Sequence, residues 1–106
     1  MAKRVVVWTQ TAANQRREIL KYWVNINGTT TYAEKLVKLT SQRVKLILSN
    51  PRLYKKADFP DTYESAMGHF SIYYKVTSNY LIITAFWDNR QNPKRLLEVL
   101  KNNDKM

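Results

Sequence analysis

The chain has 106 residues, 44% of them hydrophobic, with no cysteine and a single histidine. Disulfide bonds and thiolate metal sites are therefore excluded, and with one histidine a metal site would have to rest mainly on the eight carboxylates, so we expect no metal and no cofactor. A chain of this size supports one hydrophobic core, which predicts a single domain over residues 1–106 with a frayed tail over 101–106.

Positive charge dominates the composition. Eighteen Lys and Arg residues against eight Asp and Glu give a formal net charge of +10. A compact domain with this imbalance attracts polyanions, so a nucleic acid or an acidic protein is the expected partner; a basic protein kept soluble by its charge is the plainer alternative. No apolar run approaches the ~20 residues of a membrane span, and residues 1–8 lack the longer apolar stretch of a signal peptide. We expect a cytoplasmic protein without a membrane partner.

The first two elements are indicated by a β-branched run and a helix cap. Residues 4–8, Arg-Val-Val-Val-Trp, predict a short strand. Thr9 or Thr11 can then cap a helix that runs to about Ile26 and carries one apolar stripe at helical spacing. Gly28 follows, and glycine readily takes the left-handed conformation that closes a helix.

A second helix is predicted by a capping box. Thr31 is followed three residues later by Glu34, and in such a box each side chain bonds the free backbone N–H of the other residue. The helix should run to about Ser49, because Pro51 disfavours helical geometry in the residue before it. Two amphipathic helices joined by a short Asn-Gly-Thr turn are expected to pack as an antiparallel pair.

The remainder of the chain has the pattern of strands. A strand is predicted over 62–67, and residues 70–76 alternate between apolar and polar side chains, as in a strand with one buried face. Ser-Asn at 78–79 suits a tight turn, and the nearly all-apolar run 80–87 suits a central strand. Pro93 can begin a short C-terminal helix. The order β-α-α-β-β-β-(α) predicts an α+β fold in which a helical hairpin packs on a mainly antiparallel sheet.

Pairing within the predicted hairpin places several polar side chains on one face. A turn at Ser-Asn pairs His69 with Asp88 and Tyr73 with Thr84, and directly opposed residues share a face of the sheet. The two helices should cover the apolar face of this hairpin, which leaves the other face open. The polar set expected on the open face is His69, Ser71, Tyr73, Lys75, Asp88 and, just beyond the strand, Arg90.

A cluster of His, Asp, Arg and Tyr on a basic domain suits RNA cleavage without a metal. The 2′-hydroxyl needs a base, the leaving oxygen needs an acid, and the pentacovalent phosphate needs positive charge. In this reading His69 is the base or acid beside Asp88, and Arg90 holds the phosphate. Tyr73 stacks on a nucleobase or donates a hydrogen bond. The alternative is that a lone histidine in a turn is structural or merely exposed.

Other cations are candidate phosphate contacts. They are Arg52, Lys55, Lys56, Lys75, Lys94 and Arg95. The alternative is that such clusters in loops are only solvated surface. Trp8 and Trp23 stand at pattern positions and are expected in the core. With two isolated glycines the chain has no phosphate-binding glycine loop.

Four segments follow one another in a characteristic order and spacing over residues 4–98. They are Val-Val-Trp-Thr followed by a helix with a Tyr-Trp pair, Leu-Ile-Leu-Ser-Asn-Pro, Phe-Ser-Ile-Tyr-Tyr-Lys-Val, and Ile-Ile-Thr-Ala-Phe-Trp-Asp-Asn-Arg-Gln-Asn-Pro. In this order they resemble the RelE/ParE family of toxins, which belong to type II toxin–antitoxin systems.

This resemblance implies a small basic toxin built as a helical hairpin on an antiparallel sheet. It also implies an acidic cognate antitoxin, encoded nearby, that wraps the toxin and forms a hetero-oligomer with it. Two activities are implied by the two branches of the family: RelE-type members cut mRNA in the ribosomal A site, and ParE-type members poison DNA gyrase. A third reading is an inactive toxin fold that is retained as a binding protein.

The residues depart in part from the RelE-type pattern. RelE-type ribonucleases have basic residues on the strand that matches 62–67, an arginine near the position of Ser71, another near Arg90 and a tyrosine near the C-terminus; only Arg90 matches here. The charge and the grouping of His69, Asp88 and Arg90 nevertheless favour an endoribonuclease that cuts ribosome-bound mRNA. The missing basic residues favour the rival reading, a gyrase inhibitor that works by binding alone.

Overall fold

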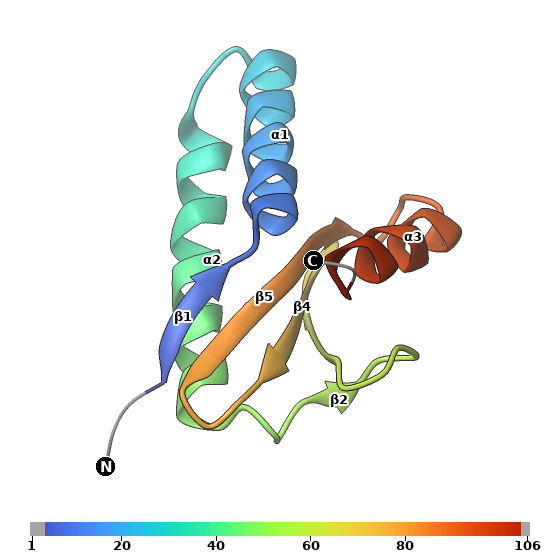
Figure 1. Ribbon diagram of the computed structural model, residues 1–106. Coiled ribbons are helices and arrows are strands. Elements are labelled where there is room, and N and C mark those ends of the chain that lie inside the picture. Colours follow the sequence, from blue (N-terminus) through green and yellow to red (C-terminus); the bar gives the residue numbers. More distant parts are fainter. Residues whose placement is uncertain (1–3, 105–106) are drawn as a thin grey trace.

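The computed structural model describes residues 4–104, with side chains up to Lys101, and its elements follow the expected order (Figure 1). The elements are β1 (Val5–Trp8), α1 (Gln10–Asn27), α2 (Thr31–Ser49), β2 (Lys55–Lys56), β3 (Tyr63–Met67), β4 (Phe70–Val76), β5 (Tyr80–Asp88) and α3 (Pro93–Asp104). The short strand β2 lies between α2 and β3, where the predicted order has no element. The expected frayed tail is helical as far as Asp104, and residues 1–3 and 105–106 lie outside the described part.

The five strands form one sheet in the order β1-β5-β4-β3-β2. β1 runs parallel to β5, and each of the other neighbouring pairs is antiparallel. The helical hairpin α1–α2 packs on one face of this sheet, and α3 lies on the other side of it (Figure 1). The predicted α+β fold, a helical hairpin on a mainly antiparallel sheet, is confirmed.

The predicted caps of α1 are confirmed, whereas the predicted N-terminal cap of α2 is wrong. The Thr9 hydroxyl oxygen accepts a hydrogen bond from the Ala12 N–H at 3.1 Å, and Gly28 closes α1 in the left-handed conformation with φ 69°. The capping box predicted for α2 is wrong, because Thr30 is the N-cap and makes no side-chain cap bond. Thr31 is already helical, so its hydroxyl is not placed to bond the N–H of Glu34.

Each face of the sheet has its own apolar cluster. The cluster under the helical hairpin consists of Ala12, Leu36, Ile47, Met67, Phe70, Ile72, Tyr74, Leu81, Ile83 and Phe86. The cluster on the opposite face consists of Tyr73, Ala85, Trp87, Leu96 and Leu100. Leu96 and Leu100 are four residues apart and therefore lie on one face of α3. This helix covers a face of the sheet that the sequence interpretation leaves open.

A β-bulge changes the pairing between β4 and β5. Close to the turn, Tyr74 lies opposite Ile83, but the next pair is Tyr73 with Ala85. The register therefore skips Thr84, which is the extra residue of the bulge in β5. A single extra residue shifts every later pair and reverses which face each later side chain of that strand occupies.

The shift overturns the predicted pairing at the end of the β4–β5 hairpin that lies away from its turn. Asp88 lies opposite Phe70, so the predicted pairs His69–Asp88 and Tyr73–Thr84 are both wrong. Because opposed residues share a face, Asp88 lies on the face covered by the helical hairpin, together with Phe70. Tyr73 lies on the opposite face, under α3. The bulge therefore separates two residues that the sequence interpretation places together.

Candidate functional site

The polar segment after β5 is organised around one carboxylate. Asp88 accepts two hydrogen bonds from the Arg90 side chain, at 2.9 Å from Nε to Oδ1 and 2.8 Å from Nη2 to Oδ2. The backbone N–H of Arg90 donates to the same Oδ1 at 3.0 Å, and the N–H of Gln91 donates to the Asp88 carbonyl, also at 3.0 Å. These four bonds hold a tight turn in which the planar guanidinium forks onto the carboxylate.

The charges of this pair stabilise each other. The side-chain hydrogen bond from Arg90 is the main cause that lowers the pKa of Asp88; partial burial opposes this lowering, and the positive field of His69 adds a smaller lowering effect. The same carboxylate raises the pKa of Arg90. The side chain of Asp88 is largely buried at 16% exposure, while that of Arg90 is 50% exposed, so water and salt still screen the pair.

An aromatic group from the helical hairpin lies beside the guanidinium. The central carbon of the Arg90 guanidinium is 5.7 Å from the centre of the Trp23 ring, within the range of a cation–π contact. Trp23 meets Tyr22 edge-on at 5.3 Å between ring centres and Tyr32 at 5.0 Å. A cavity of about 510 Å³ adjoins this group, and it is lined by Glu18, Ile19, Tyr22, Trp23, Asp88, Arg90 and Gln91.

The part of the site that the sequence interpretation misses is an aromatic wall beside Arg90, formed by Tyr22, Trp23 and Tyr32. Trp8 packs against the core as expected, with Arg16 over its ring at 4.3 Å. Trp23 is instead half-buried at the cavity. Its helical spacing gave no signal of this, because Ile19 and Leu20 of the same stripe do pack against the core.

Tyr73 lies away from this group. Its ring is buried in the cluster under α3, and its hydroxyl donates a hydrogen bond to Glu64 Oε2 at 3.0 Å. Burial is the main cause that raises the pKa of Tyr73, and the charge and hydrogen bond of Glu64 add to the rise. The ring is packed in this cluster and the hydroxyl already donates to a carboxylate, so Tyr73 is not placed to stack on a nucleobase or to bond a phosphate.

His69 lies in the turn between β3 and β4, and its side chain is exposed. Its backbone carbonyl accepts a hydrogen bond from the N–H of Asn89 at 2.8 Å, which joins this turn to the segment after β5. The structure therefore brings His69, Asp88 and Arg90 to one end of the sheet. Of the four expected catalytic residues, Tyr73 is the one that lies apart.

The six expected phosphate contacts do not share one location. Arg52, Lys56 and Lys75 line a single cavity of about 440 Å³. Lys94 and Arg95 stand at the start of α3 and line two other cavities, and Lys55 is exposed on β2. The first three residues are thus brought together from distant parts of the sequence, and the others are not.

Two further findings concern the described residues as a whole. Between residues 4 and 104, no three or more His, Cys, Asp or Glu side chains gather so that they could hold a metal ion. No helix in the same range is long and apolar enough to cross a membrane.

Comparisons with known proteins agree with this fold. The family described as "ParE toxin of type II toxin-antitoxin system, parDE" matches residues 6–93. A solved structure titled "Chromosomal ParDE TA system from P. aeruginosa" contains a similar chain, with a TM-score of 0.68 and 19% sequence identity over 79% of this chain and 94% of that chain. Comparison with curated proteins gives no match. Because the family match extends over most of the sequence, the chain belongs to the ParE toxin family of type II toxin–antitoxin systems.

Proposed function

We propose that the chain is a toxin that a cognate acidic antitoxin neutralises, and that it acts by binding DNA gyrase rather than by cutting RNA. Family membership supports the toxin and the antitoxin partner. The net charge of +10 supports an acidic antitoxin, because opposite charge speeds encounter between two proteins and suppresses wrong partners. The solved relative is itself described as a ParDE toxin–antitoxin system.

The observation that supports binding rather than cleavage is that two of the expected catalytic groups, Arg90 and Tyr73, already bond carboxylates of the chain itself. Metal-independent RNA cleavage needs a base, an acid and a cation within reach of one phosphate. Here the guanidinium of Arg90 is already forked onto Asp88, and the hydroxyl of Tyr73 is bonded to Glu64 on the opposite face of the sheet. The cavity beside Arg90 is walled by aromatic side chains, which suits a protein surface better than a phosphate backbone.

Cleavage of ribosome-bound mRNA is the second candidate. One observation favours it: the exposed imidazole of His69 lies close enough to Asp88 to influence its pKa, and Arg90 is half exposed beside Asp88. A phosphate could compete with the carboxylate for the guanidinium fork, since both anions match its geometry. The two candidates differ in what the purified toxin needs: a gyrase inhibitor acts on gyrase without ribosomes, whereas the ribonuclease needs ribosome-bound mRNA.

The test uses the full chain, expressed with and without the neighbouring antitoxin frame. We expect expression alone to stop growth and to stabilise gyrase-linked DNA breaks while mRNA 5′ ends stay unchanged, and co-expression of the antitoxin to restore growth. Purified protein should inhibit gyrase supercoiling in the absence of ribosomes. Codon-phased mRNA cuts without DNA breaks would instead establish the ribonuclease and overturn the proposal.

Two arginine variants connect the activity to the site. Arg90→Ala removes the guanidinium beside the aromatic wall and should reduce gyrase inhibition by about tenfold or more, the effect of losing a charge-assisted contact. Arg17→Ala is the matched control, because Arg17 is an exposed arginine of α1 that does not line the cavity. Antitoxin capture is measured on the same variants, since loss of antitoxin contact is a separate effect. Equal inhibition by both variants would exclude Arg90 from the target interface.

A further inference from the structure

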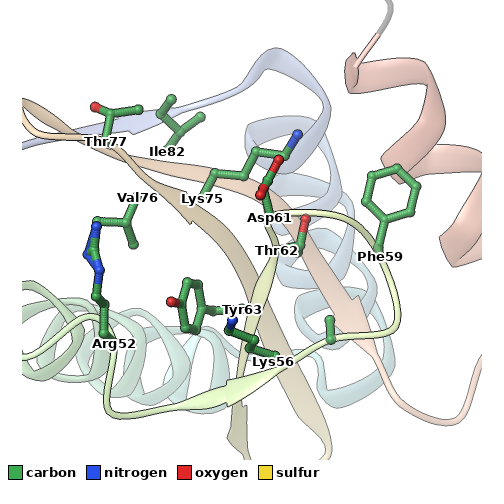
Figure 2. A pocket seen from close by; sticks show the side chains of 11 residues that line it. Arg52, Lys56, Phe59, Asp61, Thr62, Tyr63, Lys75, Val76, Thr77 and Ile82 are labelled. Carbon is green, nitrogen blue, oxygen red and sulfur yellow. The ribbon is translucent and has the colours of Figure 1, made fainter.

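A second cavity lies at an edge of the sheet, where β4 extends further than its neighbour β3. β3 begins with Tyr63 opposite Tyr74, while β4 continues to Val76, so the last residues of β4 have β5 on one side and no strand of the described chain on the other. Residues 52–62 bend around this open side. Figure 2 shows the resulting cavity, with Arg52, Lys56 and Tyr63 on one wall and the end of β4 on the other.

Most of the charged side chains that line this cavity are positive. Arg52, Lys56 and Lys75 contribute cations, and Asp61 is the one carboxylate among the lining residues. The side chains of Arg52 and Lys56 are exposed, and neither side chain forms an ion pair or hydrogen bond with another residue between positions 4 and 104. Two cations that point into a concave site without a protein partner are placed to bind an anion that comes from outside.

An aromatic ring lies between these cations. Tyr63 stacks on the buried ring of Tyr74, with 5.5 Å between ring centres and 14° between ring planes. This stack holds the Tyr63 ring in place at the cavity, where Figure 2 shows it between Lys56 and Arg52. A fixed aromatic ring with neighbouring cations is the combination by which proteins bind nucleotides, since the base stacks and the phosphate meets the charge.

We propose that this cavity binds a nucleotide, with its phosphate on Arg52 and Lys56 and its base against Tyr63. The chemistry is shared by a free nucleotide and by the terminal nucleotide of a single strand. The volume of about 440 Å³ lies within the roughly 300–1,000 Å³ usual for small-molecule sites. Ile82 near the start of β5 lines this cavity, whereas Arg90 follows the end of β5, so the site is separate from the one proposed to contact gyrase.

The test measures binding by the full chain to four probes at physiological salt: ATP, adenosine, inorganic phosphate and a short 5′-phosphorylated oligodeoxythymidine. The double variant Arg52→Ala/Lys56→Ala should weaken ATP or oligonucleotide binding by about tenfold or more, because two charge-assisted contacts are lost. The control double variant Lys35→Ala/Lys38→Ala removes the same charge from exposed positions of α2 and should change binding by less than about twofold.

A third variant should change affinity in the opposite direction. Asp61→Asn removes the carboxylate from the lining and should tighten phosphate-bearing probes by about threefold. Asparagine also suits the positive φ of 57° at this position, so the fold is retained. Tyr63→Leu should weaken ATP while leaving inorganic phosphate unchanged; if that variant fails to fold, the affinity of the original chain for ATP compared with inorganic phosphate still tests the contact of the base.

Each outcome has one meaning. ATP binding that is lost in the cavity variant but not in the α2 variant supports a free nucleotide as the ligand. The same pattern with the oligonucleotide alone supports a strand terminus. Equal weakening in both double variants would show a diffuse charge effect and overturn the site. Inorganic phosphate that binds as tightly as ATP, or no binding of any probe, would overturn the nucleotide assignment.

Discussion

The guanidinium of Arg90 forks onto the carboxylate of Asp88, two residues earlier, with donor–acceptor distances of 2.9 and 2.8 Å. The same carboxylate also accepts the backbone N–H of Arg90 at 3.0 Å. Side chain and backbone are therefore fixed together, so the direction in which the cation points depends on the charge of Asp88. The ring of Trp23 bounds the guanidinium on another side at 5.7 Å.

Replacing Asp88 with Asn tests this arrangement through pH. The pKa of Asp88 is lowered in the folded chain, chiefly by the hydrogen bond from Arg90. Its stabilising effect is therefore complete above the unfolded carboxyl pKa of about 4 and is lost as the pH falls through the lower folded value. We expect the free energy of unfolding of Asp88→Asn to fall less steeply with acid than that of the original chain. Urea unfolding at a series of acidic pH values measures this slope.

The exposed residue Asp58 supplies the control for that experiment. Asp58→Asn removes a carboxylate of the same chain outside the Arg90 pair and should leave the acid slope nearly unchanged. If the Asp88 and Asp58 variants show the same slope, the ion pair does not contribute to the pH dependence of folding.

Replacing Arg90 with Lys separates charge from geometry. Lysine keeps the positive charge but has a single ammonium group, so it cannot fork onto a carboxylate. If target contact depends on the oriented guanidinium, Arg90→Lys should lose about as much gyrase inhibition as Arg90→Ala, near tenfold. The measurement is the concentration needed for half inhibition of supercoiling. Full activity in the lysine variant would mean that charge alone is sufficient.

The overall fold was predictable because its signals are local and periodic. Thr9 and Gly28 mark both ends of α1, and the alternation over residues 70–76 marks β4. The predicted capping residue of α2 was wrong because three consecutive threonines, residues 29–31, offer equivalent capping side chains. Local patterns fix which elements form, and they fix the ends of those elements less well.

The candidate site was predictable only up to the bulge in β5. Nothing in the apolar run of this strand distinguishes Thr84 as an extra residue, yet that residue moves Asp88 to the face of the helical hairpin. The burial of Tyr73 follows from the docking of α3, a contact between segments distant in sequence. The gathering of Arg52, Lys56 and Lys75 has the same origin. Such long-range contacts leave no periodic signal in one sequence.

Removing one buried hydroxyl tests how the loop after α2 is held. The Tyr74 hydroxyl donates to the buried carbonyl of Pro51 at 2.6 Å. Tyr74→Phe leaves that carbonyl without its donor, which should lower the free energy of unfolding by about 1–2 kcal/mol. Tyr22→Phe removes the hydroxyl of an exposed tyrosine and should have almost no effect. Equal unfolding free energies in urea would indicate that water replaces the lost donor.

Truncating the buried face of α3 tests whether this helix is part of the folded core. Leu100 is 2% exposed against Tyr73 and Trp87, whereas Leu97 on the same helix is 40% exposed. Leu100→Ala should lower the free energy of unfolding by about 2–4 kcal/mol, and Leu97→Ala should lower it by less than about 1 kcal/mol. Hydrogen exchange of α3 amides should quicken in the first variant alone. Matching stabilities would mean that α3 contributes little, and the face bearing Tyr73 would then be open to a ligand, as the ribonuclease reading requires.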